Sequence, residues 1–105
     1  MRLGEQQELF AYHFSLLLVH ATKLGYKYRF EHALRCLNCH VGKDKSLHKS
    51  KLAFDLTLTK NGTLLTDSID YRELGLWWEN QHELATWGGH FSDGNHFSFT
   101  RWGRK

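Results

Sequence analysis

The segment from Leu52 to Thr59 constrains the fold most strongly, because its apolar and polar residues alternate. Every second position is apolar: Leu52, Phe54, Leu56 and Leu58. Successive side chains of a strand point to opposite faces of a sheet, so this pattern predicts a strand with one buried face. Asp55 then lies on the other face, directed away from the main core.

The same rule applied to residues 96–100 predicts that His96 shares a face with Asp55. Phe97 and Phe99 of this segment are expected to point inward, which turns His96 outward. Asp55 and His96 could therefore meet on one side of a sheet. A carboxylate in the middle of an apolar strand also needs a partner, because burying it alone is costly, and a metal ion would supply one.

The remaining segments predict two helices and further strands. Apolar residues spaced three and four apart predict a helix over 5–24, with Gly25 able to end it, and the alternation after Tyr26 predicts a strand. Asn61-Gly62 predicts a hairpin turn into 63–65. Asp70 and Glu73 resemble a capping box that opens a second helix, which ends by Trp87-Gly88-Gly89.

This order of elements predicts an α+β fold with a small antiparallel sheet and two flanking helices, not a parallel βαβ fold. At 105 residues the chain fits one domain, residues 1–105, with a single modest core. Apolar residues make up 41% of the chain, and it has no repetitive tract, which favours an ordered globular protein.

Charge and apolar segments limit the expected partners. The net charge of +3 favours an anionic partner only weakly, and the spacing of the four Trp residues indicates core or cleft positions, so we expect no nucleic-acid partner. The N-terminus lacks the features of a secretory signal, and the apolar run 14–19 is too short to span a bilayer. We expect cytoplasmic synthesis, no membrane insertion and a monomer.

Two histidine-containing segments predict a catalytic zinc site. His48, Asp55 and His96 supply three ligands, and a zinc ion held by three protein ligands keeps its fourth tetrahedral position for water. Asp93 lies three residues before His96 and is placed to take a proton from that water. The chain has eight histidines, so chance proximity of histidines to acids is the alternative explanation.

The flanking residues bring a family resemblance into view. Residues 46–55, SLHKSKLAFD, resemble the S-x-H-x-x-G-x-A-x-D signature of the zinc D-alanyl-D-alanine peptidase family, which has the Hedgehog/DD-peptidase fold. Residues 87–97, WGGHFSDGNHF, are similar to that family's closing W-G-G-x-F-x-D-x-x-H-F segment, especially in bacteriophage L-alanyl-D-glutamate endopeptidase endolysins. The two signatures occur in the family's order and span about half of the chain.

The resemblance implies that His48, Asp55 and His96 bind Zn²⁺ and that Asp93 is the catalytic base. It also implies a substrate-binding role for Arg35, because residues 32–35, HALR, match the family's x-A-x-R pattern. An arginine suits this role since its guanidinium stays protonated and can hold an oxyanion in fixed geometry, although a solvated arginine at a strand end is the alternative.

Two positions near these residues depart from the family pattern. Lys51 replaces the signature glycine and Cys36 stands where many relatives have proline. The first substitution puts the local turn in doubt but keeps the ligand spacing. The second, together with a short segment between Arg35 and His48, could mean a more open cleft or a different specificity.

The implied function is a zinc metallopeptidase that hydrolyses peptidoglycan stem peptides, with the monomeric enzyme of a phage or prophage acting on the cell wall after release. A D,D-carboxypeptidase or dipeptidase is the alternative within this class. A noncatalytic zinc-containing module that binds the cell wall is the alternative outside it. Asp93 favours an enzyme, because a binding module has no need of an acid beside an open zinc position.

Cys36-Leu37-Asn38-Cys39-His40 has the C-x-x-C-H spacing of covalent haem attachment. That reading is weak here, since the chain lacks an export signal and its only methionine is Met1. A second, structural zinc would need another pair of ligands, and no second C-x-x-C exists. A reduced thiol pair in a loop is the simplest interpretation of Cys36 and Cys39.

Overall fold

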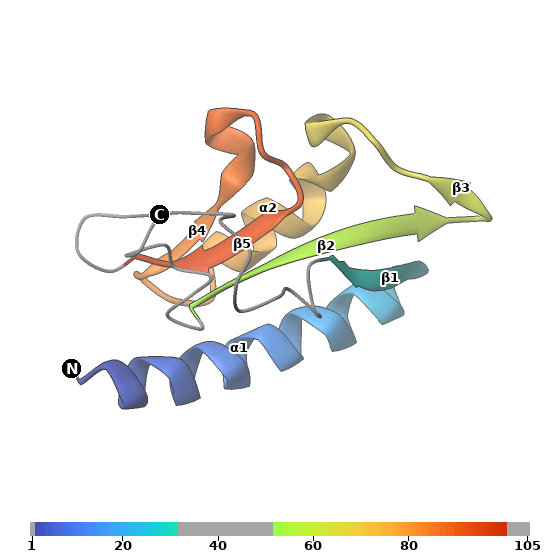
Figure 1. The fold of residues 1–105 in the computed structure, drawn as a ribbon. Helices are drawn as coiled ribbons and strands as arrows, with labels where there is room; N and C mark the ends of the chain where they lie inside the picture. Colours follow the sequence, from blue (N-terminus) through green and yellow to red (C-terminus); the bar gives the residue numbers. More distant parts are fainter. Residues whose placement is uncertain (1, 32–51, 101–105) are drawn as a thin grey trace, which may run out of the picture.

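An antiparallel sheet organises the chain in the computed structural model, which describes residues 2–31 and 52–100. The strands lie in the order β1-β2-β5-β4, and a short β3 pairs with β2 (Figure 1). The elements in chain order are α1 Leu3–Lys23, β1 Tyr26–Glu31, β2 Ala53–Lys60, β3 Thr63–Leu64, the 3-10 helix η1 Ser68–Tyr71, α2 Arg72–Glu79, β4 Ala85–Trp87, the 3-10 helix η2 Gly88–Phe91 and β5 His96–Phe99. The predicted α+β class with a small antiparallel sheet and two helices is confirmed.

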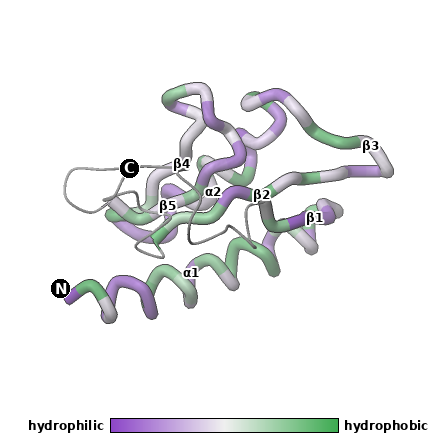
Figure 2. The backbone as a smooth tube through the Cα atoms, viewed as in Figure 1, coloured by the Kyte–Doolittle hydropathy of each residue, from purple (hydrophilic) through white to green (hydrophobic). Residues whose placement is uncertain are grey.

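One face of the sheet is apolar and packs against both helices. Phe14 of α1 stacks on Phe54 of β2 with ring centroids 5.3 Å apart, and Trp78 of α2 lies edge-on to Phe97 of β5 at 6.3 Å. In Figure 2 apolar and hydrophilic stretches alternate along α1, as expected of a helix with one buried stripe. Burying these aromatic side chains supplies much of the stabilising free energy of so small a domain.

The hairpin after β2 forms where the sequence predicts it. Asn61 and Gly62 both adopt positive φ, at 54° and 79°. Two successive residues with positive φ match the twist of the flanking strands, which is why Asn-Gly is favoured in such turns. The turn therefore returns the chain from β2 into β3.

The region between the hairpin and β5 differs from the sequence prediction. A carboxylate oxygen of Asp70 accepts the N–H of Asp67 at 3.2 Å, so the capping interaction opens η1, and α2 begins only at Arg72. The helix ends at Glu79, well before Trp87, and a three-residue strand, β4, follows. A strand this short has too few residues to show an alternating pattern.

Trp87 of β4 packs tightly because glycines border its indole ring. A Cβ atom built on Gly75 of α2 would lie 2.1 Å from Cδ2 of Trp87, and one built on Gly89 would lie 2.2 Å from the same ring. These glycines allow helix α2 and the start of η2 to approach the ring closely. Trp87 is consequently 5% exposed.

His13 and His82 join α1 to the segment after α2. Their ring centroids are 5.5 Å apart, and both rings contact Phe99. His82 Nδ1 accepts the N–H of Leu84 at 3.0 Å, while His13 Nδ1 is buried without a hydrogen-bond partner among the described residues. Burial, and next the charge of His82, lower the pKa of His13 below its usual value of 6.5.

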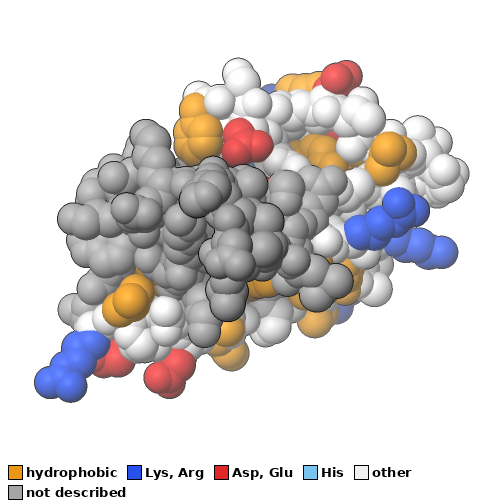
Figure 3. Space-filling model, in the orientation of Figure 1, with side chains coloured by type: hydrophobic (Ala, Val, Ile, Leu, Met, Phe, Trp, Pro, Cys, Tyr) orange, Lys and Arg blue, Asp and Glu red, His pale blue; other side chains and the backbone are white. Residues whose placement is uncertain are grey.

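Charged side chains are scattered over the described surface. On the face viewed in Figure 3, Lys and Arg side chains lie in separate small groups, as do Asp and Glu side chains. Among the described helices, none combines the length and the apolar character needed to cross a membrane.

We predict that Gly75→Ala destabilises the protein although alanine is the better helix former. The added methyl group would overlap the Trp87 ring, and overpacking of this kind costs about 1–3 kcal/mol. Gly4→Ala in α1 is the matched control, since a Cβ there meets nothing within 4 Å and the helix should gain up to about 1 kcal/mol. Urea denaturation measures both. Equal stability of the two variants would contradict the close packing on Trp87.

We also predict a loss of stability in mild acid that depends on His13. Because its pKa is lowered in the folded protein, folding favours neutral His13. This contribution is complete above pH 6.5, the usual value, and is lost as pH falls through the lower folded pKa. Thermal unfolding of wild type and His13→Leu between pH 7.5 and 5 measures the effect. Wild type should lose more stability than His13→Leu as the pH falls, and parallel curves would show that His13 does not cause the loss.

Candidate metal centre

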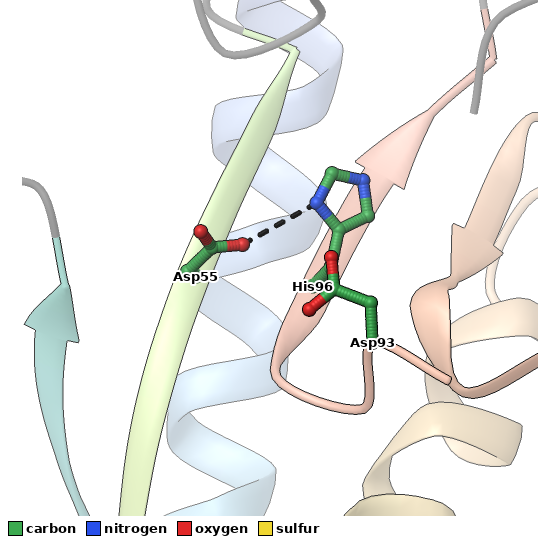
Figure 4. A group of neighbouring side chains, drawn as sticks. All are labelled: Asp55, Asp93 and His96. Carbon is green, nitrogen blue, oxygen red and sulfur yellow. Dashed lines mark hydrogen bonds and ion pairs between the residues drawn. The ribbon is translucent and has the colours of Figure 1, made fainter. Parts of the chain in front are cut away.

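Asp55 and His96 meet because β2 and β5 pair in one register. Asp55 lies directly opposite His96 in the antiparallel ladder, on the sheet face that points away from the helices. His96 Nδ1 is 3.3 Å from Asp55 Oδ1 (Figure 4). His96 is 6% exposed and the Asp55 side chain is 13% exposed, so both polar groups are largely withdrawn from water. The parity prediction for these two residues is confirmed.

Asp93 joins this pair from the loop between η2 and β5. Its ligand atom and those of Asp55 and His96 all lie within 4.8 Å of one another. Figure 4 shows the Asp93 carboxylate directed toward the space beside His96. Unlike the other two residues, Asp93 is exposed. The cluster therefore combines two sheltered groups with one that solvent can reach.

The donor chemistry of this cluster fits a zinc ion. Imidazole nitrogen and carboxylate oxygen bind zinc at about 2.0–2.2 Å, and two such atoms at a tetrahedral angle are about 3.3 Å apart. The separation of His96 Nδ1 and Asp55 Oδ1 is 3.3 Å, which equals that spacing. Asp55, Asp93 and His96 can thus hold a metal ion, and these donors suit zinc as well as other divalent metals.

The loop that bears Asp93 is fixed mainly through its backbone. Asp93 N–H donates to the Gly88 carbonyl at 2.9 Å, and His96 N–H donates to the Asp93 carbonyl at 3.1 Å. A Cβ on Gly88 would lie 2.1 Å from that Asp93 carbonyl oxygen, so the close approach requires glycine. The backbone of Asp93 is held in this way while its side chain stays exposed.

Gly94 is held on both sides by side chains from other elements. The Trp87 indole N–H donates to the Gly94 carbonyl at 2.6 Å, and Gly94 N–H donates to Ser68 Oγ of η1 at 3.0 Å. A Cβ on Gly94 would lie 2.5 Å from the Ser68 Cα. Ser68 thus helps to position the segment between Asp93 and His96. The sequence around Ser68 contains no motif that indicates this role.

Glu79 holds the segment 87–91, which precedes the Asp93 loop. One carboxylate oxygen of Glu79, at the end of α2, accepts the Trp87 N–H at 3.0 Å, and the other lies 2.7 Å from His90 Nε2. The ring of Phe91 lies edge-on to His96 with centroids 5.9 Å apart. The segment 87–91 is therefore tied to α2 through Trp87 and His90, and its last residue, Phe91, borders the cluster of Asp55, Asp93 and His96.

Three of the five predicted site residues are brought together: Asp55, Asp93 and His96. Arg35 and His48 lie outside the described residues, as do Cys36, Cys39 and His40. Comparisons of the chain with protein-family models, with curated proteins and with solved structures find no match. The geometry of the described residues is thus the direct support for a site here.

We predict that Ser68→Ala loosens the Asp93 loop without unfolding the protein. Losing one hydrogen bond of this kind costs about 1 kcal/mol, and the Gly94 amide would then exchange faster with solvent. Amide hydrogen exchange followed by NMR measures the change. Ser92→Ala, in the same loop and exposed, is the control and should leave Gly94 exchange unaltered. Unchanged Gly94 exchange in Ser68→Ala would rule out the positioning role.

Proposed function

We propose that this protein is a zinc metallopeptidase of the Hedgehog/DD-peptidase fold that hydrolyses peptidoglycan stem peptides, with the L-alanyl-D-glutamate bond as its target. The main support is the meeting of Asp55, Asp93 and His96 within 4.8 Å. Asp55 belongs to one of the two peptidase-like sequence segments, and Asp93 and His96 belong to the other. Chance similarity in two separate segments gives no reason for their acidic and histidine residues to converge in space.

His48 would complete the ligand set with Asp55 and His96. A site of two imidazoles and one carboxylate leaves a coordination position open, which is the arrangement of catalytic rather than structural zinc sites. When bound, the ion would lower the pKa of a coordinated water and polarise the scissile carbonyl. Asp55 and His96 have the rigidity that such ligands need, because both lie on paired strands.

Asp93 is the residue that fits proton transfer. It is exposed, adjacent to the proposed ligands and fixed through its backbone, so that water and substrate can both reach its carboxylate. In the proposed reaction one carboxylate oxygen accepts a proton from the attacking water and then delivers it to the leaving amine. We assign Arg35 to the substrate, where its guanidinium would stabilise the negative charge that develops on the carbonyl oxygen.

We predict that three variants separate metal binding from proton transfer. His96→Ala and Asp55→Asn should lose stoichiometric zinc, since each removes a proposed ligand. Asp93→Asn should keep zinc but cleave about 10²–10⁴-fold more slowly, because the amide cannot accept the proton. Elemental analysis of the purified proteins and release of new amino termini from cell walls measure these effects.

Glu83→Gln is the control for the loss of a carboxylate, since Glu83 is exposed and lies outside the cluster. It should retain both zinc and activity. Release of no new termini by wild type with bound zinc would contradict the peptidase proposal and favour a noncatalytic binding module. Full cleavage by Asp93→Asn would leave an enzyme but exclude Asp93 as its base.

A further inference from the structure

A polar pocket of about 300 Å³ borders the metal cluster at Asp93. The pocket lies between β2, the segment from β3 to η1, and the loop before β5. Its described lining contains hydroxyl and amide side chains, notably Thr57, Thr66, Ser68, Ser92 and Asn95. A space of this size accommodates about one amino-acid residue. Asp93 belongs both to this lining and to the cluster, so the two sites are contiguous.

The lining has a definite charge character. Among the described residues that form it, Asp93 is the only charged group, and neither Lys nor Arg contributes. Leu64 and Leu65 supply an apolar portion. The Tyr71 hydroxyl accepts the Leu58 N–H and donates to the Leu65 carbonyl, both at 3.0 Å, so it mainly fixes the pocket wall. Within the described lining, a group bound here meets neutral hydrogen-bonding partners and one negative charge.

The position of Asp93 indicates which part of a peptide enters this pocket. In the proposed reaction Asp93 passes a proton to the leaving nitrogen, so the residue that begins with that nitrogen must lie beside Asp93. Asp93 is the residue that the pocket shares with the cluster, whereas Asp55 and His96 do not line it. The pocket is therefore placed to hold the residue on the amine side of the scissile bond.

We propose that this pocket is a specificity site that accepts an uncharged amine-side residue and disfavours one that bears a free carboxylate. This inference rests on the proposed peptidase function. A carboxylate in the pocket would be repelled by Asp93 and would find no cationic partner in the described lining. A carboxamide of the same shape can instead donate to and accept from hydroxyl and amide groups.

The substrate class that follows is an amidated stem peptide. In L-alanyl-γ-D-glutamyl peptides the amine-side residue has a free α-carboxylate, whereas in L-alanyl-D-isoglutaminyl peptides that group is a carboxamide. The pocket favours the L-alanyl-D-isoglutaminyl peptides. It also disfavours the D,D-carboxypeptidase alternative, because the leaving residue of that reaction ends in a carboxylate.

The test uses two tripeptides that differ in this group alone, L-alanyl-γ-D-glutamyl-L-lysine and L-alanyl-D-isoglutaminyl-L-lysine. We expect the zinc-loaded protein to cleave the amidated peptide with a kcat/KM about tenfold higher, a ratio typical of one unfavourable charge contact near a protein surface. Cleavage of both peptides with equal kcat/KM, or faster cleavage of the carboxylate form, would overturn the specificity inference while leaving the peptidase function intact.

A lysine placed at the pocket should reverse the preference. Thr66 is exposed and lines the pocket, so Thr66→Lys would add a cation, which the described lining residues do not supply, and raise kcat/KM for the carboxylate peptide. Thr63→Lys is the matched control, since it adds the same charge three residues earlier at an exposed position outside the lining. If the ratio of kcat/KM for the two peptides is the same in Thr66→Lys and Thr63→Lys, the assignment of the pocket is overturned.

Binding provides a test that needs no turnover. The amide NMR shifts of Thr66 and Ser92 are followed while each tripeptide is added. One titration uses the zinc-loaded Asp93→Asn protein, in which cleavage is prevented. The other uses wild type without zinc, which retains the Asp93 charge. Tighter binding of the amidated peptide to the wild-type form, with shifts at these residues, supports the inference even if no peptide is cleaved. Shifts confined to other regions, or equal affinity for the two peptides, overturn it.

Discussion

The pairing of β2 with β5 determines both the core and the site. Phe54 lies opposite Phe97 on the face that packs against the helices, and the neighbouring pair, Asp55 and His96, lies on the other face. A shift of one residue in either strand would turn the polar residue of that strand into the aromatic core and expose its phenylalanine. The free energy gained by burying aromatic rings therefore also holds the carboxylate and the imidazole 3.3 Å apart.

Trp87 connects that core to the loop that bears Asp93 in the candidate metal centre. Its ring packs against α2 at Gly75, while its indole N–H donates to the Gly94 carbonyl between Asp93 and His96. A buried indole N–H needs an acceptor, since leaving it unpaired costs about 1–3 kcal/mol. Satisfying this donor fixes the loop, so the packing of α2 and the position of Asp93 depend on one side chain.

The sequence predicts most strongly what depends on periodicity. Alternation in β2 and β5 was enough to place Asp55 and His96 on a common face, because the two-residue repeat of a strand allows only two orientations. The sequence gives no signal for β4 since three residues cannot show a period. The start of α2 differs from the prediction because Asp70 caps η1 through the Asp67 N–H and does not open α2 directly. The predictions for Arg35 and His48 lie on residues that the structure does not describe.

Contacts between distant segments are harder to predict. Ser68 lies 26 residues before Gly94, and its hydroxyl has the same chemistry as any surface serine until the two segments meet. The polar pocket likewise combines residues from β2, the segment after β3 and the loop before β5, none of which forms a sequence motif with the others. Such features arise from tertiary packing, whereas the sequence pattern predicts only the secondary structure of each element and which of its residues share a face.

The contrast between sheltered and exposed groups suits a division of roles within so small a domain. Strands restrict Asp55 and His96 to fixed positions, which a metal ligand requires, but they also bury them. In the proposed reaction, proton transfer to and from water and substrate needs an accessible group, and a loop can provide it only if its backbone is held. The hydrogen bonds at Asp93 and Gly94 meet both conditions, because they use backbone atoms and leave the Asp93 carboxylate exposed.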